Sequence, residues 1–172
     1  MTSLGVKGQT QSFQTMLDRG ITDLLVHETA EGSTLYTISG QTGGVAAYAL
    51  GGPVGPVLID FAPFDATYAD SVMDSLTLLD TPEGPRLVVA GDADGGLTSF
   101  AVAPDGTLGP AGDITGLANG SGGTVLDIGQ FGSEMLFVAN AGSGSIEAYA
   151  LAPGGTLNRA FVIVDEAQNA TV

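Results

Sequence analysis

Hydrophobic residues recur along this chain in short runs separated by glycine-rich turns, and the runs repeat at a spacing of about 50 residues. Three blocks align without a gap: Leu35–Leu50, Leu87–Val102 and Leu136–Leu151. Each block opens on a largely apolar run, continues through several glycines, and closes on a segment that contains one aromatic residue. A repeat of this length that is built from short strands is typical of β-propeller blades.

Each repeat is predicted to contain four strands joined by tight turns. The turn at Ala103-Pro104-Asp105-Gly106 is a strong hairpin signal, because proline presets φ and glycine tolerates positive φ. The first strands are expected at Ile21–Val26, Val72–Leu78 and Thr124–Ile128; the second begin at Leu35, Leu87 and Leu136; the third end near Tyr48, Phe100 and Tyr149; the fourth lie at Val57–Phe61, Thr107–Ile114 and Thr156–Val164.

The predicted fold class is therefore all-β and β-propeller-like, with three four-stranded antiparallel blades. We expect an N-terminal segment over 1–20 with a surplus outer strand at Gln11–Leu17, blades over 21–66, 67–118 and 119–166, and a tail over 167–172. Propellers close a ring of about four to eight blades. Three blades therefore predict a partial propeller or half of an oligomeric ring, whose partner is either the remaining blades of a longer chain or a second copy of itself.

Charge narrows the choice of partners. The chain carries 19 acidic and 4 basic side chains, a net charge of −15. A protein with so few cations cannot neutralise phosphates, which argues against nucleic-acid binding. We also predict no membrane span, because no run approaches the ~20 apolar residues that one needs. The absence of cysteine excludes disulfides and thiol catalysis.

The third repeat carries a family resemblance. Phe137–Tyr149, followed by Ala152–Leu157, resembles a blade of the lactonase-type seven-bladed propellers, with an Asn before a Gly/Ser turn and a second strand ending on an aromatic residue. The resemblance covers Ile21–Val164 but is sharp only here, since Gly91 and Ser39 stand where the third repeat has Asn140. The acidic, glycine-rich chain is also similar to the propeller regions of bacterial haemolysin-type (RTX) calcium-binding proteins, although it lacks their Gly-Gly-x-Gly-x-Asp repeats.

Five aspartates form a candidate metal site. Asp23, Asp74 and Asp127 are predicted to share one position on the innermost strands, and Asp92 and Asp94 lie in a loop at the same end of the blades. Oxygen ligands that converge in this way suit Ca²⁺, the one cofactor that the sequence indicates. The alternative is that these carboxylates only cap backbone N–H groups at strand starts and turns.

The sequence supports an enzyme less than it supports a metal site. His27 is the only histidine and is expected at a hairpin on the opposite side from the aspartates, so no catalytic residue is assigned. The aromatic column Tyr48, Phe100 and Tyr149 is expected to pack between blades. We predict a non-enzymatic propeller scaffold or binding module of a secreted haemolysin-type calcium-binding protein. A lactonase-like hydrolase, intact or degenerate, is the alternative.

The same resemblance bears on location. Residues 1–20 lack the apolar core of a secretory signal peptide. The resemblance to haemolysin-type proteins therefore implies an extracellular location reached without a signal peptide, with a cytoplasmic location as the alternative.

Overall fold

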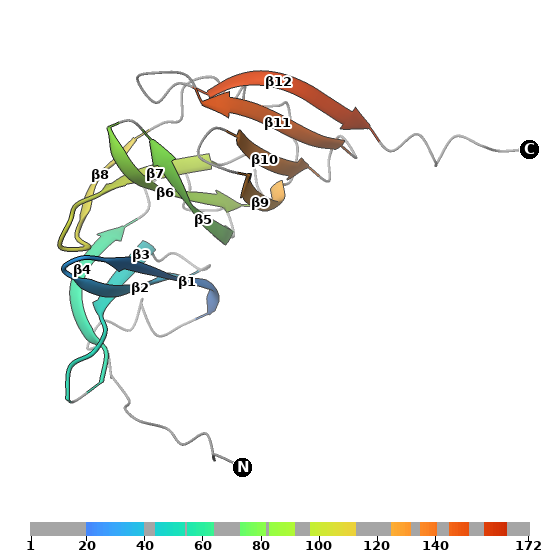
Figure 1. Ribbon diagram of the computed structural model, residues 1–172. Helices are drawn as coiled ribbons and strands as arrows, with labels where there is room; N and C mark the ends of the chain where they lie inside the picture. The colour runs from blue at the N-terminus through green and yellow to red at the C-terminus, as the bar shows by residue number, and fades with distance from the viewer. Residues whose placement is uncertain are drawn as a thin grey trace, which may run out of the picture.

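The computed structural model of the chain contains only β-strands among the residues it describes, which are 20–39, 44–53, 55–63, 73–81, 83–91, 97–112, 125–131, 135–140, 145–151 and 157–164. Twelve strands form three four-stranded antiparallel sheets (Figure 1). The predicted fold class, an all-β chain with three propeller-like blades, is confirmed. The predicted strand at Gln11–Leu17 lies outside the described residues.

Each sheet is a simple meander, because its strands follow one another in chain order. The hairpin turns predicted from the sequence separate neighbouring strands and set this order. We call the sheets blades 1, 2 and 3. Blade 1 comprises β1 (Ile21–Thr29), β2 (Gly32–Ser39), β3 (Gly44–Ala49) and β4 (Val57–Pro63); blade 2 comprises β5 (Met73–Thr81), β6 (Gly84–Gly91), β7 (Leu97–Val102) and β8 (Leu108–Gly112); blade 3 comprises β9 (Val125–Phe131), β10 (Met135–Asn140), β11 (Ser145–Leu151) and β12 (Leu157–Val164).

The blades follow one another in space in the same order as in the chain (Figure 1). Strand β5 contacts both β1 and β9, so the first strands of successive blades lie together. At the other edge, β4 contacts β8. The first strand of each blade is thus the inner one, as the sequence predicted. No helix in the described part of the chain is long and apolar enough to cross a membrane.

The hydrophobic core lies between blades rather than within one sheet. The forward face of a blade is the face that it turns towards the next blade in the chain, and the rear face is the opposite one. The forward face of blade 1 packs against the rear face of blade 2. The forward face contributes Tyr36, Ile38, Val45 and Ala47, and the rear face contributes Leu76, Leu87, Val89, Phe100 and Val102. The aromatic column is buried, with Tyr48, Phe100 and Tyr149 at most 6% exposed. Phe100 packs between blades as predicted, whereas Tyr48 packs against Leu35 and Phe61 of its own blade. Side chains alternate between the two faces along each strand, so the same strand supplies residues to the forward face and to the rear face of its blade.

Candidate functional site

Asp23 joins blade 1 to blade 2 through its carboxylate. It lies near the start of β1, where one oxygen accepts a 2.8 Å hydrogen bond from the Leu24 backbone N–H. The other oxygen accepts a 2.9 Å hydrogen bond from the N–H of Leu76 in β5. Both oxygens are therefore engaged by backbone donors. Asp23 serves the capping role that the sequence left open beside the metal role.

A second aspartate, which the sequence did not single out, repeats this arrangement on β4. One Asp60 oxygen accepts a 2.8 Å hydrogen bond from the Phe61 N–H, and the other accepts a 2.7 Å hydrogen bond from the N–H of Leu108 in β8. Each carboxylate thus holds its own strand and the next blade at once. A charged acceptor strengthens such hydrogen bonds relative to neutral ones. We call Asp23 and Asp60 the interblade aspartates.

The strand register corrects one part of the predicted aspartate column. Asp23 pairs with Ile38, Ser75 with Ala90, and Asp127 with Ala139. These three pairs are equivalent in the repeat, so the counterpart of Asp23 in blade 2 is Ser75, not Asp74. Each inner strand has an irregularity at its start, and Asp74 occupies the position that the strand register skips there, like Thr22 and Leu126. A one-residue offset sends a strand side chain to the other face.

The structure brings the first residues of β1, β5 and β9 to the same end of the blades, but it describes only part of the predicted metal site. The side chains of Asp74 and Asp127 lie outside the described residues, as do Asp92 and Asp94 altogether. Within the described part of the chain, no group of three or more His, Cys, Asp or Glu side chains is close enough to hold a metal ion. Calcium binding stays a prediction.

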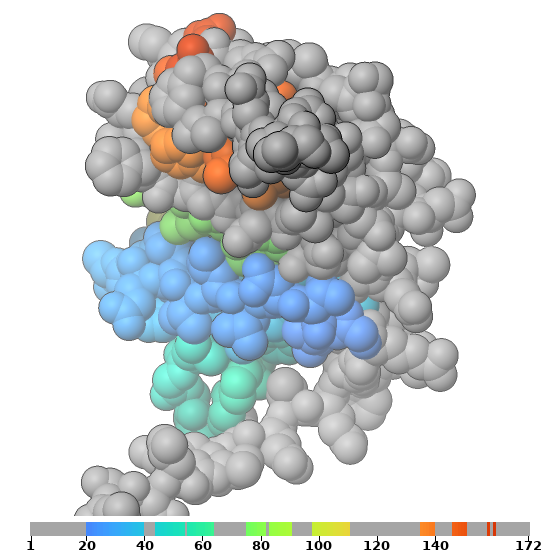
Figure 2. Space-filling model, turned by 90° about the vertical axis from the view of Figure 1, so that its right-hand side faces the viewer, coloured from blue at the N-terminus to red at the C-terminus, as the bar shows by residue number. Residues whose placement is uncertain are grey.

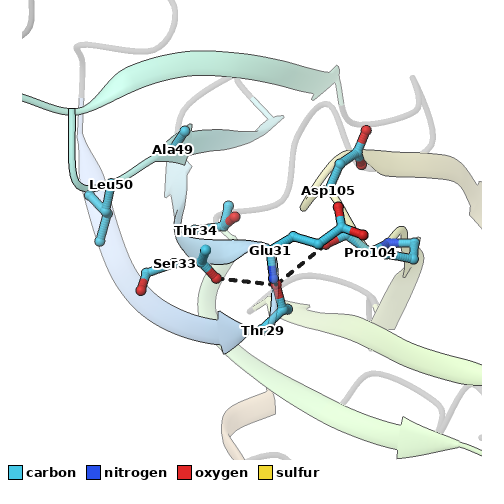
Figure 3. Close-up of a pocket in the computed structure, with 9 residues that line it drawn as sticks. Thr29, Glu31, Ser33, Thr34, Ala49, Leu50, Pro104 and Asp105 are labelled. Atoms are coloured by element: carbon cyan, nitrogen blue, oxygen red, sulfur yellow. Dashed lines mark hydrogen bonds between the residues drawn. The ribbon is translucent and has the colours of Figure 1, made fainter.

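A pocket of about 160 Å³ lies at the opposite end of the blades from Asp23 (Figure 3). The β1–β2 hairpin of blade 1 forms one wall, and the turn between β7 and β8 of blade 2 forms another. The pocket residues are Thr29, Glu31, Gly32, Ser33, Thr34, Ala49, Leu50, Pro104 and Asp105. Hydroxyls and two exposed carboxylates, those of Glu31 and Asp105, give the pocket a polar and anionic lining.

Hydrogen bonds fix the turn of blade 2 against blade 1 below this pocket. The buried Tyr36 hydroxyl donates a 2.9 Å hydrogen bond to the Gly106 carbonyl. Burial raises the pKa of Tyr36 to about 12, against the opposing effect of a hydrogen bond with Thr34. The Thr29 hydroxyl lies 3.4 Å from the Pro104 carbonyl and accepts a 3.2 Å hydrogen bond from the Glu31 N–H (Figure 3).

The turn itself is held by Asp105. Its carboxylate accepts hydrogen bonds of 2.7 Å from the Thr107 hydroxyl and 3.0 Å from the Thr107 N–H. These two donors lower the pKa of Asp105, the hydroxyl having the larger effect. The carboxylate stays ionised at neutral pH. The pocket can therefore accept hydrogen bonds from a hydroxylated or cationic small molecule.

His27 does not lie in the hairpin turn where the sequence placed it. It lies within β1, paired with Thr34, on the same side of the strand as Asp23 and Leu25. Its Nδ1 atom is buried and has no hydrogen-bond partner among the described residues. No acid is therefore hydrogen-bonded to this atom in that part of the chain. The residues described here contain no Ser-His-Asp arrangement, which needs those hydrogen bonds.

Two solved structures share this fold. The periplasmic gluconolactonase of Pseudomonas aeruginosa matches with a TM-score of 0.59 and 19% identity, over 83% of this chain and 40% of that one. A protein from Lactobacillus plantarum matches with a TM-score of 0.61 and 16% identity, over 83% of this chain and 41% of that one. The sequence matches no protein-family model and no curated protein.

These neighbours confirm the β-propeller architecture predicted from the repeats. At identities below 20% they show the fold and no more. The chain spans about 40% of the length of the two solved structures, as expected of a partial propeller. The resemblance to haemolysin-type calcium-binding proteins stays a prediction.

Proposed function

We propose that the chain supplies three blades of a lactonase-like propeller that hydrolyses a lactone of a sugar acid. The observation that carries this proposal is the fold similarity to a gluconolactonase over 83% of the chain. It favours the lactonase-like alternative over the haemolysin-associated scaffold. A ring closed by other blades would be needed, because the three blades match about 40% of that enzyme.

The polar pocket is consistent with a ligand of this class. A sugar lactone offers several hydroxyl donors, and the Glu31, Asp105 and Ser33 side chains offer acceptors at the pocket rim. Lactone hydrolysis also requires a general base within hydrogen-bond reach of the attacking water. No residue is assigned that role. The inner end of the ring, where Asp127 lies on β9, is the place to search for it.

Hydrolysis of glucono-1,5-lactone tests the proposal. Acid release is followed with a pH indicator at several protein concentrations, and the spontaneous rate in buffer is subtracted. The proposal predicts a rate that is proportional to protein concentration and saturates with the lactone. Aliphatic lactones without hydroxyl groups serve as the matched control substrates. A rate equal to the buffer rate for every lactone would contradict it.

A second candidate is a non-enzymatic scaffold or binding module, as the sequence predicted. One observation favours it: both oxygens of Asp23 accept backbone hydrogen bonds, and His27 Nδ1 has no hydrogen-bond partner among the described residues, so neither side chain is positioned for catalysis there. The proposed association with secreted haemolysin-type proteins and an extracellular location belong to this candidate. The periplasmic location of the gluconolactonase agrees with an extracytoplasmic site for the chain.

Calcium binding at the aspartate end of the blades is part of the same candidate. Bound Ca²⁺ would stabilise the folded chain by mass action. Melting temperatures with millimolar Ca²⁺ and with chelator are compared for the wild type and for the Asp74→Asn, Asp127→Asn double variant. Calcium binding at these residues predicts a rise in the wild type that the variant lacks. Equal melting temperatures in the wild type would leave these aspartates without a metal.

A further inference from the structure

Each end of the row of blades exposes one half of the interface that neighbouring blades form inside the chain: the rear face of blade 1 and the forward face of blade 3. Between blades 1 and 2, the rear face of blade 2 covers the forward face of blade 1 and buries Leu76 to 6% exposure. In the repeat register, Leu24 and Val26 of blade 1 occupy the positions of Leu76 and Leu78 in blade 2. Leu24 is 60% exposed and Val26 is 50% exposed. Figure 2 shows the β1–β2 hairpin that carries them at the surface of the molecule.

The opposite end shows the complementary half. On the forward face of blade 3, Ile146 occupies the position that Val45 has in blade 1. Val45 is fully buried against blade 2, whereas Ile146 is 43% exposed. Ala148, which is already buried within the chain, stands where blade 1 has Ala47, and the partly buried Phe137 stands where blade 1 has Tyr36. Blade 3 therefore presents small and apolar residues in the pattern that receives a rear face.

We propose that two copies of this chain close a six-bladed ring, in which blade 3 of each copy packs its forward face on the rear face of blade 1 of the other. A second copy is the expected partner, because the same pair of faces, forward on rear, already packs together between blades 1 and 2. A two-fold axis produces both contacts at once and leaves neither apolar face exposed. Six blades fall within the range that propellers adopt.

Two further positions fit this pairing. Asp127 holds in blade 3 the register position of Asp23, which accepts from Leu76 of the following blade. Ring closure would bring position 127 next to Leu24 of the second copy. In the same way, Phe137 holds the register position of Tyr36, whose hydroxyl donates to the Gly106 carbonyl in the turn between β7 and β8. Closure would place Phe137 against the turn between β3 and β4 of the second copy.

Buried Ala46 and Tyr48 limit the extent of the exposed surface. They lie on the rear face of blade 1 and pack against Leu35 and Phe61 of the same blade. The exposed area of this face therefore centres on the inner strand β1. The corresponding inner strand of blade 2, β5, is the strand through which blade 2 contacts β1 and β2 of blade 1. The pairing is independent of what the ring binds or hydrolyses.

Light scattering on the full chain after size exclusion measures the closed pair directly. The proposal predicts a particle with twice the 17.2 kDa mass of one chain. Leu24→Asp should convert it to a folded monomer, because a carboxylate would enter the apolar interface. Val57→Asp is the matched control: Val57 is 47% exposed on the same blade but pairs with Ala49 on the forward side. It should leave the dimer intact.

A gain-of-function variant keeps the proposal testable even if Leu24→Asp does not fold. Phe137→Tyr adds the hydroxyl that Tyr36 has, at the position that faces the backbone of the β3–β4 turn of the second copy. A buried hydrogen bond should tighten each of the two contacts about fivefold, and the dimer dissociation constant about 25-fold. A wild-type monomer, open polymers or an unchanged dissociation constant would each overturn the proposal. A monomer would mean that other blades, or residues 1–19, cover the face.

Discussion

The Tyr36 hydroxyl of blade 1 donates a 2.9 Å hydrogen bond to the Gly106 carbonyl in the β7–β8 turn of blade 2. Tyr36 is fully buried, so its ring fills the interblade core while its one polar atom is satisfied by the next blade. This contact makes the turn of one blade part of the packing of its neighbour. Asp105, which precedes Gly106 in this turn, lines the polar pocket.

Removal of the hydroxyl should weaken the blade pair. Tyr36→Phe keeps the ring and leaves the buried Gly106 carbonyl without its donor. We expect the free energy of unfolding to fall by about 1–3 kcal/mol, the cost of a buried unsatisfied polar group. Urea denaturation followed by circular dichroism measures this change. An unchanged midpoint would mean that the hydroxyl is equally well satisfied by water.

Alkaline pH should destabilise the fold through the same residue. The pKa of Tyr36 is about 12 in the folded chain, against 10.0 for an ordinary tyrosine. Between these values the unfolded chain loses the phenol proton and the folded chain keeps it. The free energy of unfolding should therefore be fully retained below pH 10 and fall by up to ~2–3 kcal/mol towards pH 12. Tyr36→Phe should lose this part of the pH dependence, and identical profiles for the two proteins would contradict the account.

Gly106 should tolerate no side chain. Its φ of 86° disfavours other residues, and a Cβ atom there would overlap the Thr34 hydroxyl. Gly106→Ala should cost about 1–2 kcal/mol for the backbone alone, and more for the overlap. Gly51→Ala is the matched control, because its φ is 93° and nothing lies within 4 Å of the added atom.

The excess over Gly51→Ala should shrink when Thr34→Ala is added to Gly106→Ala. Thermal unfolding of the two single variants and of the double variant gives the coupling energy between positions 34 and 106. Additive effects would show that Thr34 does not limit the space at the turn.

The strands were predictable from the sequence because local signals define them. Pro104-Asp105-Gly106 marks a turn, and the gap-free repeat of Leu35–Leu50 fixes the second and third strands of all three blades. The burial of the aromatic column was predictable for the same reason, because Tyr48, Phe100 and Tyr149 lie at the same point of the repeat.

The aspartate column was only partly predictable. Asp74 looks equivalent to Asp23 by eye, but the irregularity at the start of β5 shifts the pairing so that Ser75 takes that position. Pairing offsets of this kind depend on the partner strand and carry no clear sequence signal. The donors to Asp23 and Asp60 lie on another blade, 53 and 48 residues away, so only packing reveals them.

The outer interblade aspartate should contribute to stability independently of calcium. Asp60→Asn removes the charge that accepts from the Leu108 N–H, and we expect a loss of about 1–2 kcal/mol in the free energy of unfolding. Asp80→Asn, at an exposed position of β5, is the matched control and should change the stability by less than about 0.5 kcal/mol. Denaturation in the presence of chelator measures both variants. Equal losses for the two variants would contradict the interblade role of Asp60.

The central claim is that aspartate carboxylates of one blade hold backbone N–H groups of the next, and amide NMR tests it most directly. The Leu76 amide proton of the ¹⁵N-labelled chain is compared between the wild type and Asp23→Asn at one neutral pH. Because Leu76 donates to the Asp23 carboxylate at 2.9 Å, its proton resonance should move upfield when the charged acceptor is replaced by an amide. A Leu76 resonance at the same position in both proteins would contradict the account.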